Sequence, residues 1–219
     1  MKGCDTILGC EIETIVLRYR DLSSKNTIKI HNDKIASKGF VWWGWWAKPQ
    51  EKVALEVFKS LAEKAVSDTH FEVFLLDSGR SELRRAQCID IKFDFNNPIP
   101  SPQKNATPAY YNKNKYLMWF KFDKISEPID SPDKDINNYS YVQVDEHFAS
   151  KTSPFSVFNN KKVYNLNELI EQQCTIWFLR KAKTDDENRQ IVSYAPGNGN
   201  VETSFSIANT NQLLWLSDL

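Results

Sequence analysis

The chain has 219 residues, 41 % of them hydrophobic, including 13 Phe, 8 Tyr and 7 Trp. This length and apolar share predict one large domain, or one domain with extensions, and exclude a chain that is disordered throughout. The 28 Lys and Arg balance the 28 Asp and Glu, so the composition lacks the basic surplus that drives sequence-independent binding to duplex nucleic acid. A nucleic-acid role would have to depend on a local pocket, a local patch or a partner domain.

The first part of the chain predicts a strand followed by a helix. Residues 12–22 mix β-branched with charged side chains, which is typical of a strand. In residues 27–38, Ile28, His31 and Ile35 recur at the spacing that places them on one face of a helix.

An aromatic strand and a second helix follow. Gly39 is placed to end the first helix in the left-handed conformation. Residues 40–46, FVWWGWW, are too aromatic for a loop and too few for a helix, so they predict a buried strand. Gly44 in this strand would let another backbone or a ligand come close. Residues 54–66 carry apolar side chains on one face and charges on the other, which predicts a helix.

Shorter elements fill the rest of the chain. The segment 83–95 alternates apolar with polar residues and predicts a long strand that can hold a bulge. Further strands are expected at 71–76, 116–125 and 175–181, a short helix at 165–173, polar loops at 96–114 and 128–138, and a flexible connection at 182–211 with room for one strand at 204–207. Together these elements predict an α+β domain with a strongly bent sheet or open β-barrel and two or three flanking helices, compact over about residues 8–182.

The cysteines and histidines are too scattered to predict a metal site. They are Cys4, Cys10, Cys88, Cys174, His31, His70 and His147. No two cysteines form a CxxC pair, whereas a structural zinc site usually shows paired ligands at short spacing. Acidic residues precede any long apolar run, which argues against a signal peptide, and no stretch reaches the ~18 apolar residues of a membrane span. A cytoplasmic chain with reduced thiols and no membrane contact is therefore expected.

The last eight residues, 212–219, read QLLWLSDL. They resemble the first strand of calcineurin-like metallophosphoesterases, in which a pattern such as LxxLSDxH ends the strand with two metal ligands. The resemblance implies that Asp218 binds a metal, that the His would be residue 220, and that a missing domain holds two divalent metal ions that activate water. Residues 183–211 would then be the linker to that domain. The alternative is an ordinary terminal strand that packs on the preceding domain.

Four of the seven tryptophans lie close together, at Trp42, Trp43, Trp45 and Trp46. In a strand, Trp43 and Trp45 point to one face and the other two to the opposite face, so one face can serve the core while the other lines a surface or a cleft. Flat aromatic rings suit flat or cationic ligands, because stacking on a base contributes ~1–3 kcal/mol without reading its identity.

The order of segments around these tryptophans resembles the PUA-like superfold, in particular its EVE, ASCH and YTH branches. VWWGWWAKP is followed by a helix, then by VFLLDSG, RAQCIDI and YLMWFKFDKI, all within residues 40–125. The resemblance implies a domain over residues 1–182 that binds a modified base in DNA or RNA through an aromatic cage. The insertion at 96–114, the extension before residue 40 and the balanced charge depart from the family, and they favour a free nucleotide or another small aromatic ligand over a polymer.

The resemblance also implies a ligand-binding set that combines aromatic rings with polar groups for the base edge: Trp43, Trp46, Lys48, Asp77, Ser78, Arg80, Trp119 and Trp177. The tryptophans would stack on the ligand or close its pocket, the lysine and arginine would contact phosphate or carbonyl oxygens, and Asp77 and Ser78 would read hydrogen-bond donors. Arg84 and Arg85 are further phosphate contacts, but neighbours in a strand point to opposite faces, so only one can join a given patch. Each residue has a plainer interpretation: core packing for tryptophan, solvent exposure for lysine, and a turn for residues 77–79.

These inferences predict a non-catalytic recognition or sensor domain that steers an attached metallophosphoesterase and binds a modified base or a nucleotide-like ligand. No Ser/His/Asp set, Gly-rich phosphate loop or deaminase motif can be assembled, which argues against an enzyme in this chain. The alternative is a protein–protein adaptor or homodimerisation domain that uses exposed aromatic residues. A concave aromatic site would favour a ligand, and a flat aromatic patch would favour a partner.

Overall fold

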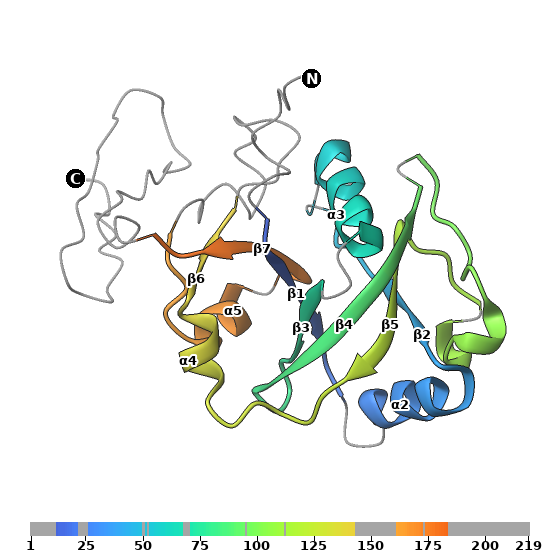
Figure 1. Ribbon diagram of the computed structural model, residues 1–219, viewed down its shortest axis with the longest axis horizontal. Coiled ribbons are helices and arrows are strands. Elements are labelled where there is room, and N and C mark those ends of the chain that lie inside the picture. The colour runs from blue at the N-terminus through green and yellow to red at the C-terminus, as the bar shows by residue number, and fades with distance from the viewer. Residues whose placement is uncertain are drawn as a thin grey trace, which may run out of the picture.

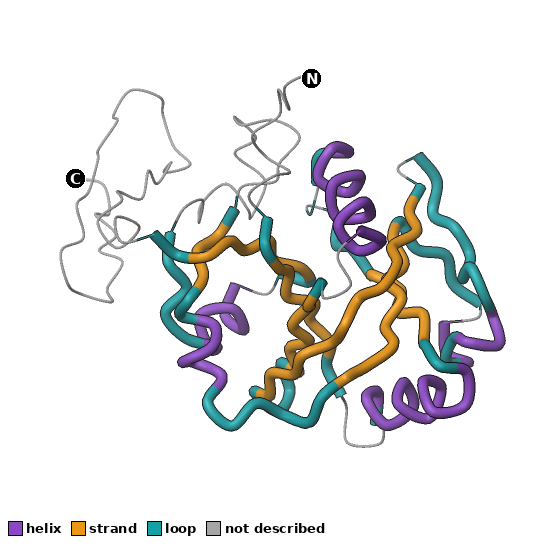
Figure 2. The backbone as a smooth tube through the Cα atoms, viewed as in Figure 1, coloured by secondary structure: helices purple, strands orange, loops and turns teal. Residues whose placement is uncertain are grey.

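The computed structural model describes residues 12–21, 26–49, 51, 53–67, 71–94, 96–111, 113–142, 161–172 and 174–183. In chain order its elements are β1 (Thr14–Tyr19), α2 (Thr27–Lys38), β2 (Val41–Trp45), α3 (Leu55–Ser67), β3 (Glu72–Asp77), β4 (Glu82–Phe93), the 3₁₀ turns η1 (Lys104–Ala106) and η2 (Ala109–Tyr111), β5 (Met118–Ile125), α4 (Pro132–Ile136), β6 (Tyr139–Tyr141), α5 (Leu166–Gln172) and β7 (Ile176–Lys181). Figure 1 and Figure 2 show how they are arranged. No helix among these residues is both long and apolar enough to cross a membrane.

All seven strands belong to one mixed sheet, in the order β2-β5-β4-β3-β1-β7-β6. β1 and β3 run parallel, and the other neighbouring pairs run antiparallel. The pairing of β4 with β5 shifts register between Gln87 and Asp90, which confirms the predicted bulge. The predicted α+β class is confirmed.

The sheet curls until its two sides meet. Trp45, the last residue of the edge strand β2, donates its Nε1–H to Thr175 Oγ1 at 2.9 Å. Thr175 directly precedes β7, which lies on the other side of the sheet. The buried Glu51 carboxylate accepts hydrogen bonds from the Thr175 N–H and hydroxyl and from the Lys48 N–H at 2.8 Å. These bonds hold the strongly bent, open barrel that the sequence predicts.

Side chains that alternate along the strands fill the inside of this barrel. The register places Leu17 of β1 beside Leu75 of β3, and Trp43 of β2 beside Phe120 of β5. All four are buried, because the pleat of a strand points every second side chain to the same face. The interior of the bent sheet is therefore one part of the core, and consecutive buried residues in β1 and β3 show that the other face of these strands is covered as well.

The helices cover the sheet on two sides. α2 packs against β2 and β5, and α3 packs against β4. The Phe58 ring of α3 contacts Trp45 and Phe93. α4 and α5 lie together on the side of the sheet away from α2 and α3 (Figure 1).

The loop between β4 and β5 folds over the outer face of β2 and β5. Its Tyr111 and Tyr116 rings pack with Trp42 and Trp119 in a second apolar cluster, separate from the main core. A Cβ atom on Gly44 would lie 2.7 Å from the Tyr116 ring, so the predicted close approach at this glycine is made by a tyrosine side chain. The tightly covered strand explains why glycine occupies this position.

Most predicted elements are confirmed, and the differences concern short ones. Gly39 ends α2 with φ 79°, as expected. The segment 128–138, expected to be a loop, instead contains α4 and leads into β6, and the predicted loop 96–114 holds two 3₁₀ turns. The described residues form four α-helices rather than two or three, because elements of three to five residues show too little periodicity to be recognised. The predicted linker 183–211, the strand at 204–207 and the terminal segment 212–219 lie outside the described residues, apart from residue 183.

Candidate functional site

Three rings meet at the end of the barrel where β1 and β3 finish. The Trp43 ring of β2 contacts the Tyr19 ring of β1 edge-on, with centroids 5.6 Å apart. The Trp43 ring also packs against the His31 ring of α2, with ring centroids 4.5 Å apart and the ring planes tilted by 37°. Trp43 and His31 are buried, whereas Tyr19 is partly exposed. We call these three residues the aromatic floor of the barrel end.

His31 contributes an unused hydrogen-bond acceptor to this floor. Its Nδ1 lies 2.8 Å from the Thr27 carbonyl oxygen, and since a carbonyl only accepts, Nδ1 carries the proton. Nε2 is then a bare acceptor, and it is buried without a hydrogen-bond partner among the described residues. Burial lowers the pKa of His31 to about 4, so the ring is neutral at physiological pH.

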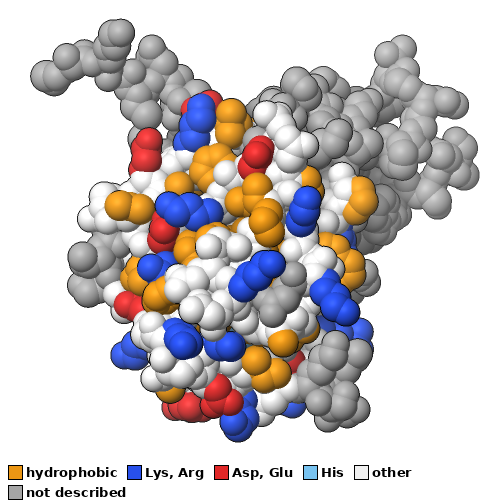
Figure 3. Space-filling model, turned by 90° about the vertical axis from the view of Figure 1, so that its right-hand side faces the viewer, with side chains coloured by type: hydrophobic (Ala, Val, Ile, Leu, Met, Phe, Trp, Pro, Cys, Tyr) orange, Lys and Arg blue, Asp and Glu red, His pale blue; other side chains and the backbone are white. Residues whose placement is uncertain are grey.

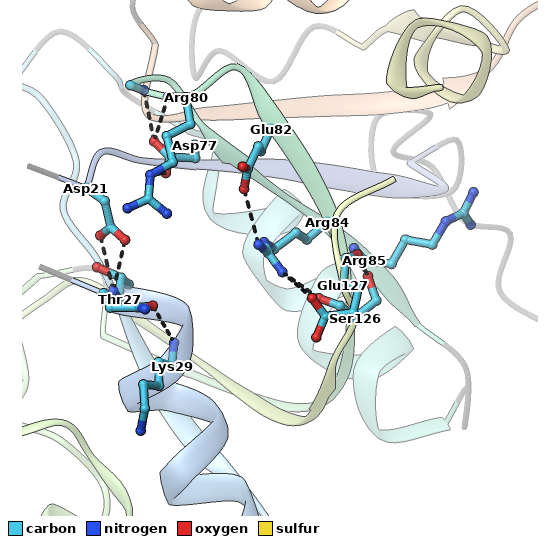
Figure 4. A network of polar contacts seen from close by, with 12 residues as sticks. Asp21, Thr27, Lys29, Asp77, Arg80, Glu82, Arg84, Arg85, Ser126 and Glu127 are labelled. Atoms are coloured by element: carbon cyan, nitrogen blue, oxygen red, sulfur yellow. Dashed lines mark hydrogen bonds and ion pairs between the residues drawn. The ribbon is translucent and has the colours of Figure 1, made fainter. Parts of the chain in front are cut away.

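The turn between β3 and β4 forms one side of a polar rim above the floor. The buried Asp77 carboxylate accepts hydrogen bonds from the Gly79 N–H at 2.8 Å and the Arg80 N–H at 3.3 Å. Ser78 donates its backbone N–H to the Tyr19 carbonyl oxygen at 3.0 Å. This turn therefore lies directly over the end of β1 (Figure 4).

Arg84 reaches across the rim from β4. Its Nη1 donates to the Ser126 carbonyl oxygen at 3.2 Å, and its Nη2 donates to Glu82 Oε2 at 3.1 Å (Figure 4). Its Nε is buried and has no hydrogen-bond partner in the described part of the chain. Burial, followed by the charge of Asp77, raises the pKa of Tyr19 well above its usual range, so this phenol stays protonated next to the guanidinium.

The start of α2 and Tyr110 complete the rim. Both carboxylate oxygens of Asp21 accept the Thr27 N–H, at 3.0 and 3.2 Å, and Asn26 caps the Lys29 N–H at 3.0 Å. These side chains already occupy the helix N-terminus, where an anion would otherwise bind. Tyr110 packs on His31 with ring centroids 6.1 Å apart and is 43 % exposed, so it is the accessible ring beside the floor.

The structure brings together four of the predicted ligand-binding residues at this end. Trp43 lies in the floor, and Asp77, Ser78 and Arg80 lie in the rim. At 3 % exposure the Trp43 ring is almost inaccessible, so Tyr110 presents the ring surface that Trp43 was expected to present.

The other four predicted residues lie elsewhere. Trp46 is 81 % exposed beyond the opposite end of β2, and Lys48 is close to it beside the barrel-closing Glu51. Trp119 is buried under the β4–β5 loop and donates its indole N–H to the Ile99 carbonyl oxygen. Trp177 is buried and donates to the Gln172 side chain of α5. They do not share one pocket with the barrel end, because Trp46 and Lys48 follow the other end of β2, Trp119 lies under the β4–β5 loop, and Trp177 is bonded to a side chain of α5.

Arg84 and Arg85 point to opposite faces, as predicted. Arg84 belongs to the rim, whereas Arg85 pairs with Glu72 and with Asp135 of α4, at 2.5 and 2.8 Å. Of this pair, Arg84 is therefore the arginine that faces the barrel end.

Sequence reasoning missed Tyr19, His31 and Tyr110 as site residues. His31 was visible only as part of a helix face, and no spacing relates it to Trp43 on the next strand. Tyr110 lies in a Pro/Asn-rich loop without periodicity, so its contact with α2 had no signal in the sequence.

The described residues contain no group of three or more His, Cys, Asp or Glu side chains placed to hold a metal ion. Cys88 and Cys174 are buried free thiols. Burial raises the pKa of Cys174 to about 12 and also raises that of Cys88, so neither is a reactive thiolate. The predicted metal ligand Asp218 lies outside the described residues.

Comparison with known proteins identifies one family. A sequence model described as Pua-like matches residues 15–190, which covers the described strands except for the first residue of β1. No curated protein matches significantly, and no solved structure does so either.

Proposed function

This chain belongs to the Pua-like family, and on that premise we propose that it is a recognition domain, without catalytic activity of its own, that binds a modified base or a nucleotide-like ligand at the barrel end. The observation that carries the proposal is the meeting of the aromatic floor with two buried polar atoms, His31 Nε2 and Arg84 Nε, that have no hydrogen-bond partner among the described residues. An aromatic surface combined with a few unsatisfied polar groups is typical of a small-molecule site.

The two polar atoms have complementary chemistry. His31 Nε2 accepts a hydrogen bond, and Arg84 Nε donates one. The edge of a nucleobase presents donors and acceptors next to one another, so a base can satisfy both atoms while its flat face stacks on an aromatic ring. Tyr110 is the ring available for that stacking. Buried polar atoms without partners cost free energy, and ligand binding would remove that cost.

Binding can be tested with nucleosides and 5′-monophosphates, unmodified or methylated, in a thermal-shift screen followed by titration. Tyr110→Ala should weaken binding roughly 5- to 150-fold, because base stacking contributes ~1–3 kcal/mol. Tyr164→Ala is the matched control, since Tyr164 is equally exposed, at 41 %, but lies next to α5. Equal loss in both variants, or no binding by any compound, would contradict the proposal.

A second candidate function is a protein–protein contact at Trp46. A tryptophan that is 81 % exposed at the end of an edge strand is unusual for a residue with so much apolar surface. Sedimentation analysis of the wild type and Trp46→Ala distinguishes the two functions. A homodimer that Trp46→Ala dissociates would favour the adaptor.

We also propose that the recognition domain is attached to a metallophosphoesterase domain. It rests on the resemblance of QLLWLSDL at residues 212–219, which lie beyond the family match. In that arrangement the recognition domain would direct a phosphoesterase with two divalent metal ions to its substrate. Phosphodiesterase activity of a longer chain, lost on Asp218→Asn and absent from residues 1–182, would support it.

A further inference from the structure

Both arginines of the rim face carboxylates. Arg84 Nη2 lies 3.1 Å from Glu82 Oε2, and its Nη1 lies 3.6 Å from Glu127 Oε2 (Figure 4). Arg80 Nε lies 4.0 Å from the buried Asp77 carboxylate. Because each guanidinium is paired within the chain, the rim offers an incoming anion little positive charge that is not already balanced.

Asp21 adds a negative charge to the start of α2. Its two carboxylate oxygens accept the Thr27 N–H, and it forms no ion pair with any described residue. Burial is the main reason that the pKa values of Tyr19 and Tyr110 are raised, and the charge of Asp21 adds to both shifts. The same charge partly offsets the lowering effect of burial on the pKa of His31. Asp21 is therefore close enough to act on three rings of the site.

The rim is acidic on balance. Its two guanidinium groups are outnumbered by the carboxylates of Asp21, Asp77, Glu82 and Glu127. The nearby Lys29 does not change this balance, because its ammonium group bonds to Asp33 at 2.8 Å. Arg20 follows Tyr19 and points to the other face of β1, where its charge, after burial, lowers the pKa of Arg18. The electrostatic field at the barrel end therefore favours a cation over an anion.

On the face that carries the β4–β5 loop, basic side chains are interspersed with acidic and hydrophobic ones (Figure 3). In the sheet beneath this loop, Asp90 of β4 stands opposite Lys121 of β5. A row of phosphates would meet charges of both signs here, so this face does not reverse the preference of the rim.

The acidic rim surrounds an exposed ring and a buried acceptor. Tyr110 is 43 % exposed and packs on His31, which is fully buried and whose Nε2 has no hydrogen-bond partner among the described residues. The neutral His31 ring adds no positive charge of its own. A flat cation is attracted both by the face of an aromatic ring and by the carboxylates around it.

We propose that the barrel end selects a heteroaromatic base that carries a positive charge, such as that of 7-methylguanosine, and disfavours ligands that carry a phosphate. This rests on the proposed function and narrows its ligand to one chemical class. Guanine presents an N–H donor beside its O6 acceptor, which suits His31 Nε2 and Arg84 Nε. Methylation at N7 makes the ring positive and leaves that edge unchanged, so guanosine and 7-methylguanosine are a matched pair that differs in charge.

The test is calorimetric titration with guanosine, 7-methylguanosine and 7-methylguanosine 5′-monophosphate at low salt, in a slightly acidic buffer in which the methylated ring keeps its charge. 7-Methylguanosine should bind roughly 10-fold more tightly than guanosine, and the monophosphate should bind more weakly than its nucleoside. Added salt should weaken the binding of 7-methylguanosine and leave that of guanosine unchanged, because salt screens the interaction of the charged ligand.

Three variants change the charge at defined positions. Asp21→Asn keeps an oxygen for the Thr27 N–H, so it should lower the affinity for 7-methylguanosine roughly 3- to 10-fold while the affinity for guanosine is retained. Asp33→Asn is the matched control, since it changes the net charge equally at a side chain of α2 that is 65 % exposed, and both affinities should stay unchanged. Arg80→Gln removes a positive charge from the rim and should strengthen the binding of 7-methylguanosine.

The outcomes separate the charge selectivity from the site itself. Equal affinity for guanosine and 7-methylguanosine, tighter binding of the monophosphate, or equal effects of Asp21→Asn and Asp33→Asn would overturn the selectivity and leave the barrel-end site standing. The same conclusion follows if these three compounds fail to bind while an uncharged nucleoside from the wider screen binds. If no nucleoside binds, both proposals fail.

Discussion

The His31 ring of α2 packs on the Trp43 ring of β2, with centroids 4.5 Å apart, and its Nε2 is buried without a partner among the described residues. The bond from Nδ1 to the Thr27 carbonyl oxygen, at 2.8 Å, determines which nitrogen is bare, and the Tyr110 hydroxyl lies 3.4 Å from the same Nδ1. A histidine held in this way gives the interior of the barrel end a defined acceptor.

Burial of His31 predicts a specific dependence of stability on pH. The unfolded chain protonates this ring near pH 6.5, whereas the folded chain does so only near pH 4. The unfolded state therefore binds more protons between these values, and the free energy of unfolding should fall by about 3 kcal/mol as pH decreases from 6.5 to 4. Urea unfolding at a series of pH values measures this dependence. His31→Phe should flatten the curve in this window, and an unchanged curve would show that another group titrates.

Glu51 is predicted to hold the barrel closed. Its buried carboxylate accepts hydrogen bonds from Thr175 and Lys48, so Glu51→Ala should lower the free energy of unfolding by at least about 2 kcal/mol, since hydrogen bonds to charged groups are the stronger kind. Chemical denaturation gives the value. Glu56→Ala, on the exposed face of α3, is the control and should cost within about 0.5 kcal/mol.

Gly44→Ala should destabilise the protein through a contact on the outer face. The added Cβ would lie 2.7 Å from the Tyr116 ring, and overpacking of this kind costs about 1–3 kcal/mol. Thermal unfolding detects the loss. In the background of Tyr116→Ala the same substitution should cost much less, and an equal cost in both backgrounds would place the strain elsewhere.

Arg84 and Arg85 are predicted to differ in function despite being neighbours. Arg84→Lys keeps the charge but removes the Nε donor, so binding of the methylated nucleoside that scores best in the screen should weaken roughly 10-fold or more. Arg85→Lys should leave binding unchanged, because that side chain pairs with Glu72 and Asp135 on the other face. Calorimetric titration measures the nucleoside affinity of both variants. An equal loss of affinity in the two would show that Arg84 does not contact the ligand.

The sequence predicted the secondary-structure elements better than the tertiary contacts between them. The apolar face of α2, the aromatic strand and the opposite orientation of Arg84 and Arg85 follow from periodicities of 3.6 and 2 residues. The Glu51–Thr175 contact joins residues 124 positions apart, and periodicity contains no information about it. Trp46, Trp119 and Trp177 were predicted to bind the ligand because they carry large rings, but such rings serve a core as well as a ligand. Only the positions of these residues in or beside β2, β5 and β7 separate the two uses.

The most direct test of the barrel-end site is a two-dimensional ¹H–¹⁵N spectrum, recorded while methylated nucleosides are added, that follows the seven tryptophan indole N–H signals. A base-binding site at the barrel end predicts that the indole N–H signal of Trp43 shifts when ligand is added, whereas the signals of Trp119 and Trp177 do not. Tyr110→Ala should reduce the shift of the Trp43 signal. A response confined to Trp46, or no response to any nucleoside, would contradict a base-binding site at this end of the barrel.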